Sequence, residues 1–159
     1  ATLVPEDGNP RNFFGVSAAV DEERAFIGGH GSEQRGVPTG AVHVFAQSDG
    51  DWQREAKLTA DDGYGGDAFG VSLALEGDRL LIGAQWDDEP NGERAGSAYV
   101  FERTGNAWTQ AVKLAAEDGD SQDWFGWTAA MTGDSGFVGA PSADNEDEQR
   151  AGAAYVFSL

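Results

Sequence analysis

The sequence contains no cysteine and only two lysines, Lys57 and Lys113. Without thiols, the chain can form neither disulfides nor thiolate metal sites, and its redox compartment stays open. No apolar run approaches the roughly 20 residues that a helix needs to cross a bilayer. The first residues lack the basic and apolar regions of a signal peptide, as in a mature or trimmed chain. Proline is scarce at 5 residues but glycine reaches 23, which favours short strands joined by turns.

Positive charge is also scarce, because 10 basic residues face 28 acidic ones and give a formal net charge of −18. So acidic a chain repels the phosphate backbone, and we expect no binding to nucleic acid. A surface with few lysines suits high salt or a cation-rich extracellular setting. We therefore expect an extracellular or cell-surface location; a merely soluble acidic surface is the plain alternative.

The most informative feature is an internal repeat. A Phe-Gly pair recurs at positions 14, 69 and 125, and the segments "AFIGG", "LLIGA" and "GFVGA" follow at the same spacing. The segments "GAVHVF", "GSAYVF" and "GAAYVF" complete the pattern. We interpret residues 1–159 as one unit of three repeats, at approximately 1–55, 56–111 and 112–159.

Each repeat has the pattern of four antiparallel strands. In the second copy, "FGVSLAL" alternates in polarity, "RLLIGA" is a nearly continuous apolar run, and "GSAYVFER" and "WTQAVKLAA" follow. Tight "EGD" and "TGN" turns join neighbouring strands, as in hairpins. Four antiparallel strands in about 50 residues are typical of one blade of a β-propeller. A solenoid of parallel coils is the weaker alternative, because such short turns require antiparallel pairs.

The repeat resembles the FG-GAP repeat of the integrin α-subunit propeller. The third copy is most similar, with Phe125-Gly126, Gly139-Ala140-Pro141 and the segment 152–157. The first and second copies read Gly-Gly-His and Gly-Ala-Gln where the family has Gly-Ala-Pro. The resemblance implies an all-β propeller and a role in adhesion or ligand binding. The family's calcium loop is not carried over, because "VDEERA", "LEGDRL" and "MTGDSG" are too short to surround a cation.

Three blades alone should not close a ring, since propellers typically have about four to eight. The start "ATLVPEDG" aligns with "AKLTADDG", the end of a fourth strand, whereas the third copy lacks its own fourth strand. One hypothesis is a head-to-tail homodimer, in which two chains form a six-bladed ring. The alternatives are a fragment of a larger propeller and assembly in another number.

The long loops should lie on one face, where binding sites usually occur. These loops carry aromatic rings beside carboxylates, an arrangement that suits a glycan or an extracellular protein. The predicted ligand-binding residues are Tyr64, Trp86, Asp87, Asp88, Trp124 and His30. Packing between blades is the alternative for Trp124. The phenylalanines Phe13, Phe14, Phe69, Phe125, Phe45, Phe101 and Phe157 are expected in the core.

Carboxylates on the same loops are candidate ligands for Ca²⁺. The segment "EDGDSQD" offers Asp118, Asp120 and Asp123, and the second copy offers Asp62 and Asp67. The competing interpretation is that the recurring Asp-Gly pairs, Asp7-Gly8 among them, make turns by bonding to backbone amides.

We expect no enzymatic activity. The sequence has no zinc-binding spacing and no nucleophile elbow, and its two histidines, His30 and His43, lie where the sister copies carry other residues. We set His43 against Ala98 and Ala154. The favoured function is a lectin-like or integrin-like binding module; the alternatives are a structural self-assembling unit, a Ca²⁺-dependent interaction domain and a hydrolase fragment.

Overall fold

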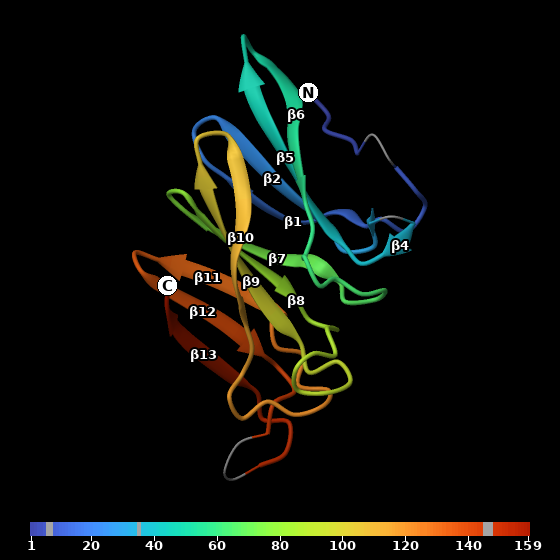
Figure 1. Ribbon diagram of the computed structural model, residues 1–159, viewed down its shortest axis with the longest axis vertical. Coiled ribbons are helices and arrows are strands. Elements are labelled where there is room, and N and C mark those ends of the chain that lie inside the picture. The colour runs from blue at the N-terminus through green and yellow to red at the C-terminus, as the bar shows by residue number, and fades with distance from the viewer. Residues whose placement is uncertain (6–7, 35, 145–147) are drawn as a thin grey trace.

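The computed structural model describes residues 1–5, 8–34, 36–144 and 148–159. These residues form three antiparallel sheets, with no helix among them (Figure 1). The sheets are consecutive along the chain and correspond to the three predicted repeats, so we call them blades 1, 2 and 3. The all-β fold predicted from the repeat is confirmed.

Blades 1 and 2 each contain four strands. Blade 1 has the order β1-β2-β5-β6, comprising β1 (Phe14–Val20), β2 (Arg24–Gly29), β5 (Ala41–Ser48) and β6 (Asp51–Leu58). Its long loop adds a small hairpin of β3 (Glu33–Gln34) and β4 (Val37–Pro38). Blade 2 comprises β7 (Phe69–Glu76), β8 (Arg79–Ala84), β9 (Ser97–Thr104) and β10 (Ala107–Leu114).

Blade 3 has three strands among the described residues: β11 (Thr128–Thr132), β12 (Ser135–Ala140) and β13 (Ala153–Ser158). No fourth strand lies beside β13 in the part of the chain that the structure describes. Residues 1–5, which align with the end of such a strand, form no strand here. The three sheets therefore make an open row of blades rather than a closed ring.

The blades pack face to face through two apolar cores. The trailing face of a blade, which carries Leu81, Ala98 and Val100 in blade 2, packs on the following blade. The leading face carries Phe69, Ile82 and Tyr99 in blade 2 and packs on the preceding blade. Successive strand residues point to opposite faces, so one strand supplies both cores. Its two buried faces explain why "RLLIGA" is almost wholly apolar.

The glycine of each Phe-Gly pair is required by the way the blades join. Gly70 has a φ of +90°, and a Cβ there would lie 2.7 Å from the carbonyl oxygen of Ala41 in blade 1. Both the left-handed backbone and the close approach favour glycine. Phe69 forms a parallel bridge to Gly40, and Phe125 forms the same bridge to Gly96. The motif is thus a joint between neighbouring blades.

The long loops lie along the lower right of Figure 1 and the tight hairpin turns along the upper left. The loops that precede the inner strands β1, β7 and β11 therefore meet the loops between the second and third main strands of each blade. This separation brings the chemically varied segments to one side of the molecule, as the sequence predicts.

Candidate functional site

A hollow lies at the same place in each blade, between the loop before the inner strand and the loop after the second strand. The three hollows differ in chemistry, because the loops differ where the strands agree. We call them the aromatic hollow in blade 1, the acidic hollow in blade 2 and the third hollow in blade 3. Their volumes are about 680, 360 and 250 Å³ respectively.

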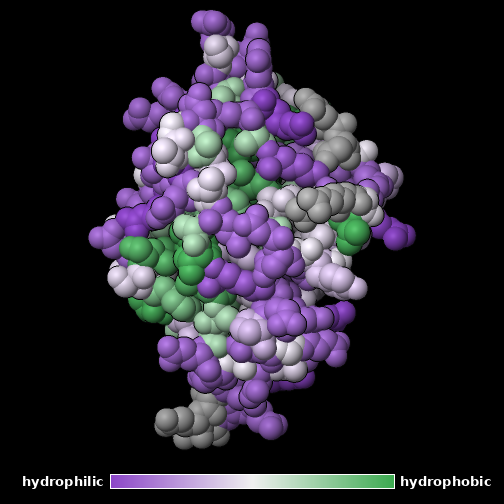
Figure 2. All heavy atoms as spheres, viewed as in Figure 1, coloured by the Kyte–Doolittle hydropathy of each residue, from purple (hydrophilic) through white to green (hydrophobic). Residues whose placement is uncertain are grey.

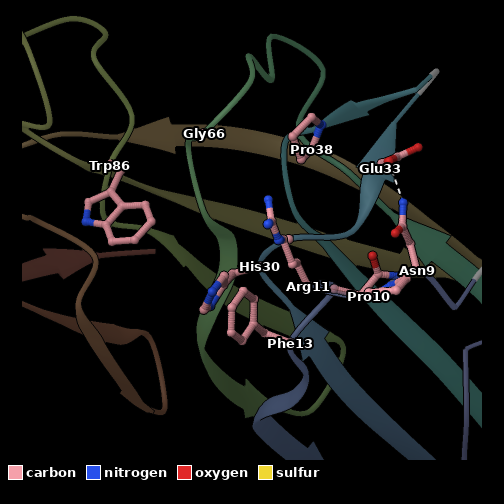
Figure 3. A pocket seen from close by; sticks show the side chains of 11 residues that line it. Asn9, Pro10, Arg11, Phe13, His30, Glu33, Pro38, Gly66 and Trp86 are labelled. Atoms are coloured by element: carbon pink, nitrogen blue, oxygen red, sulfur yellow. Dashed lines mark hydrogen bonds between the residues drawn. The ribbon is translucent and has the colours of Figure 1, made fainter.

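The aromatic hollow is the largest and is built around three rings (Figure 3). Phe13 and His30 are stacked, with ring centroids 4.6 Å apart and an interplanar angle of 28°. Trp86 reaches in from the loop after β8 of the neighbouring blade, with its ring centroid 6.2 Å from that of His30. Phe13 is 58% exposed and Trp86 37% exposed, so both offer ring surface to a ligand.

The ring of Phe13 lies outside the core, although its backbone conformation is shared by the equivalent residues of the other blades. Phe13 has a φ of +50°, and the equivalent residues Ala68 and Trp124 have φ values of +61° and +59°. This left-handed conformation is uncommon for non-glycine residues. The assignment of Phe13 to the core was therefore wrong. The sequence did hold a signal: the copies carry phenylalanine, alanine and tryptophan at this position, and the alanine, Ala68, is buried whereas Phe13 is exposed.

Polar groups line the rest of the aromatic hollow. Asn9 donates a hydrogen bond of 2.8 Å to the carboxylate of Glu33, and the exposed side chain of Arg11 lies between this pair and the rings (Figure 3). Burial lowers the pKa of His30, so its imidazole is neutral at pH 7. Its Nδ1 is buried and has no hydrogen-bond partner among the described residues. The hollow thus combines apolar rings with polar side chains.

The acidic hollow contains Tyr64, Asp87 and Asp88 of the predicted ligand-binding set, together with Asp62 and Asp67. Tyr64 is exposed, but Asp87 is buried and its carboxylate accepts hydrogen bonds from Tyr99 at 2.6 Å and Lys113 at 2.9 Å. Asp87 is therefore committed to the interior of blade 2 rather than to a ligand.

Lys113 and Tyr99 form the centre of this network. Lys113 also contacts the carboxylate of Asp62 at 2.7 Å, and the hydroxyl of Tyr99 lies 3.0 Å from Asp62. Burial opposes ionisation of Asp62, but Lys113 prevails and lowers its pKa. Burial and the nearby carboxylate of Asp87 raise the pKa of Tyr99. The hydroxyl therefore stays protonated and acts as a hydrogen-bond donor.

Asp67 performs a structural task in its loop. It is 6% exposed, and its carboxylate accepts a hydrogen bond of 2.5 Å from the backbone N–H of Tyr64. Asp123 does the same in blade 3, where it accepts the N–H of Asp120 at 2.8 Å. Burial raises the pKa of Asp67 to about 6, and the neighbouring Asp87 adds to the rise.

The third hollow includes Asp120 and Asp123 but not Asp118. Asp118 lies beside Tyr155 instead, and burial together with this carboxylate raises the pKa of Tyr155 to about 12. Across the described residues, no group of three or more histidine, aspartate or glutamate side chains is arranged to hold a metal ion. Among the predicted carboxylates, Asp67 and Asp123 accept hydrogen bonds from backbone N–H groups, and Asp62 contacts Lys113. Asp7, of the first Asp-Gly pair, lies outside the described residues.

Trp124 lies apart from the other predicted ligand-binding residues. Its ring stacks on that of Trp127 at a centroid distance of 5.7 Å, and its buried Nε1 has no hydrogen-bond partner among the described residues. The predicted set is thus divided between three places: His30 and Trp86 share the aromatic hollow, Tyr64, Asp87 and Asp88 the acidic one, and Trp124 joins neither.

The alignment of His43 with Ala98 and Ala154 was wrong by one residue. His43 pairs with Ile27 across the sheet, as Tyr99 pairs with Ile82 and Tyr155 with Val138. Its ring meets Phe14 edge-on at 5.4 Å, the distance that separates Tyr99 from Phe69. His43 is therefore a fully buried counterpart of the two tyrosines.

Three consecutive antiparallel sheets, joined through Phe-Gly bridges and packed face to face, define a propeller-type repeat protein. Residues 1–45, 52–101 and 108–157 match the FG-GAP repeat, and the chain belongs to this family. FG-GAP repeats are found in integrin-like adhesion propellers. No curated protein matches the sequence. In the described part of the chain, no helix is long and apolar enough to span a membrane.

Proposed function

We propose that the chain is a non-catalytic, extracellular recognition module that binds a glycan in the aromatic hollow. The observation that carries this proposal is the stacked pair of Phe13 and His30 beside Trp86, three rings that line a hollow of about 680 Å³. Sugars present C–H-rich faces that pack on aromatic rings, and their hydroxyl groups need nearby donors and acceptors.

The polar rim meets the second requirement. Arg11, Asn9 and Glu33 surround the rings with donors and acceptors. The guanidinium of Arg94 lies 5.7 Å from the ring centroid of Trp86 and supports the ring by a cation–π contact. The ring is thus held in place before a ligand arrives, which reduces the entropic cost of binding.

A glycan array probed with the purified chain tests the proposal. We expect Trp86→Ala to weaken binding of a retained glycan by about tenfold or more, because a central aromatic anchor is lost. The matched control is Tyr64→Ala, which removes an exposed aromatic ring from the acidic hollow. Equal loss from both variants, or no glycan bound at all, contradicts the proposal and favours a structural unit or a protein ligand.

A chelator arm of the same array tests the calcium prediction separately. Because Asp67 and Asp123 already accept backbone N–H groups and Asp62 contacts Lys113, we expect binding to persist in EDTA. Binding that disappears in EDTA and returns with Ca²⁺ would instead identify a Ca²⁺-dependent interaction domain.

A further inference from the structure

His30 is the titratable side chain among the three rings of the aromatic hollow (Figure 3). It follows β2, stacks on Phe13 with ring centroids 4.6 Å apart, and lies 6.2 Å from the ring centroid of Trp86. Because all three rings line one hollow, a sugar that packs there covers His30 as well. A bound ligand therefore adds to the burial of the imidazole.

Burial in the free protein already opposes a charge on His30. Its Nδ1 is buried and has no hydrogen-bond partner among the described residues. A neutral ring can keep its proton on Nε2, whereas a charged ring must carry a second one on Nδ1. A buried N–H without an acceptor is costly, and burial accordingly lowers the pKa of His30.

Within blade 1, two charged side chains line the same hollow. Arg11, from the loop before β1, carries the same charge as an imidazolium and would not stabilise it. Glu33 of β3 carries the opposite charge, but one of its carboxylate oxygens accepts the hydrogen bond from Asn9. Burial is the cause of the lowered pKa of His30, and neither side chain offsets it.

The charged groups of blade 2 do not stabilise an imidazolium either. The guanidinium of Arg94 lies over the ring of Trp86, 5.7 Å from its centroid, and has the wrong sign. Three carboxylates of this region line the acidic hollow instead: Asp67, Asp87 and Asp88. In the described part of the chain, His30 thus has no counter-ion.

Ligand binding and protonation of His30 therefore oppose each other. A ligand that covers the ring makes its charged form less stable still, so the pKa of His30 is lower in the complex than in the free protein. Linkage requires the converse for the ligand. Its affinity is highest where His30 is neutral and decreases as the pH falls through the pKa of His30 in the free protein.

We propose that acid releases the glycan from the aromatic hollow because His30 takes up a proton. This proposal rests on the glycan-binding function proposed above and adds the regulation of that site. The equivalent residues of blades 2 and 3 are Gln85 and Pro141, which do not titrate. The histidine therefore gives this hollow a dependence on pH that the sister positions do not have.

The test uses the glycan that the array retains most strongly at pH 7.5, immobilised on a biosensor, from pH 8 to pH 4.5. This range stays above the isoelectric point of about 4.1. The affinity of the parent chain should be constant while His30 is neutral and then decrease, with a slope that approaches about tenfold per pH unit. His30→Phe keeps a ring that stacks but cannot be protonated, so its affinity should be the same at both ends of the range.

Other groups also titrate in acid, because the chain has 28 acidic residues and the surface shown in Figure 2 is mostly hydrophilic. Two matched controls separate these groups from His30. Glu33→Gln removes the carboxylate that lines the hollow, and Asp67→Asn removes a buried carboxyl group whose pKa is raised to about 6. Both variants should show the same decrease in affinity as the parent chain. A decrease that disappears in either control and persists in His30→Phe overturns the proposal.

NMR provides a second measurement that does not depend on a variant. The pKa of His30, followed through the C–H signals of its ring, should be lower with the glycan than without it. An equal or higher pKa in the complex overturns the proposal. A parent chain that binds equally at pH 7.5 and pH 4.5 also overturns it, although glycan binding itself would then stand. A chain that retains no glycan at pH 7.5 overturns glycan binding and its regulation together.

Discussion

Asp67 is a buried carboxylate that its loop uses as a hydrogen-bond acceptor. This role requires an oxygen atom but no negative charge. It accepts the N–H of Tyr64 while desolvated and close to Asp87. Blade 1 has Asn12 at the equivalent position, which is just as buried but uncharged. An amide oxygen accepts the same hydrogen bond without the cost of burying a charge.

We therefore predict that Asp67→Asn stabilises the protein at neutral pH. Burial raises the pKa of Asp67 from 3.8 to about 6, so between these values the folded state binds a proton that the unfolded state has lost. Stability conferred by protonated Asp67 is complete below pH 4 and decreases as the pH rises to about 6, by about 3 kcal/mol.

Urea unfolding of both proteins from pH 4 to pH 8 measures this effect. The free energy of unfolding of Asp67→Asn should exceed that of the parent at pH 8, and the difference should shrink as the pH falls to 4. Comparison of the two proteins cancels the background from the other carboxylates. A difference that stays constant with pH would show that Asp67 titrates normally.

Residues were predictable where the copies agree and poorly predictable where they differ. The Phe-Gly pair identified the joint between blades, because glycine is required there by a φ near +90° and by the neighbouring carbonyl. Phe13 was misplaced, since an aromatic residue next to the Phe-Gly pair reads as core in the sequence, whereas its ring lines the aromatic hollow. His43 was misaligned by one position in the sequence comparison. The register of the strands shows that it replaces a tyrosine of the other blades.

At the scale of elements, strand β10 is attached to the long loops through one side chain. Lys113 lies opposite Tyr99 in the sheet and reaches Asp62 before the inner strand and Asp87 after the second strand. Burial works against the charge of Lys113, but the two carboxylates raise its pKa. One cation thus holds two loops on an outer strand.

We predict that Lys113→Met lowers the free energy of unfolding by about 3 kcal/mol, because Asp87 would stay buried without its cation. The control is Lys57→Met at the equivalent position of β6, where the ammonium donates to the carbonyl of Glu33. This loss should cost about 1 kcal/mol, since no buried charge is left behind.

A double variant separates lost contacts from an unpaired charge. Blade 3 has Ala143 where blade 2 has Asp87, so the fold accommodates alanine there. Asp87→Ala combined with Lys113→Met should recover part of the stability lost by Lys113→Met alone. If the double variant is less stable than either single one by the sum of both losses, the ion pair is not the cause.

The strands of each blade were predictable from the sequence, whereas the hollows were not. Alternation and turn chemistry identified β7 to β10 almost to the residue. The hollows depend on which loop side chains turn outward and which are used as acceptors inside the loop. Asp87 and Trp86 are adjacent in the sequence, but one is buried under Tyr99 and the other faces the aromatic hollow.

At the scale of the whole molecule, the formal charge of −18 acts against both folding and assembly. The apolar cores between blades must hold together sheets whose loops repel one another. Two copies of such a chain repel each other further. Screening shortens the reach of these interactions from about 10 Å at 0.1 M salt to about 3 Å at 1 M.

We therefore predict that the melting temperature rises by several degrees between 0.1 and 1 M NaCl. Scanning calorimetry measures this effect. A variant that combines Glu22→Gln, Glu76→Gln and Glu117→Gln, all exposed sites, lowers the net charge from −18 to −15 and should show a smaller rise. The effect of charge screening saturates as the salt concentration increases, whereas a general salting-out effect keeps growing. A linear rise of the melting temperature that is equal in both proteins would therefore show that charge repulsion is not the cause.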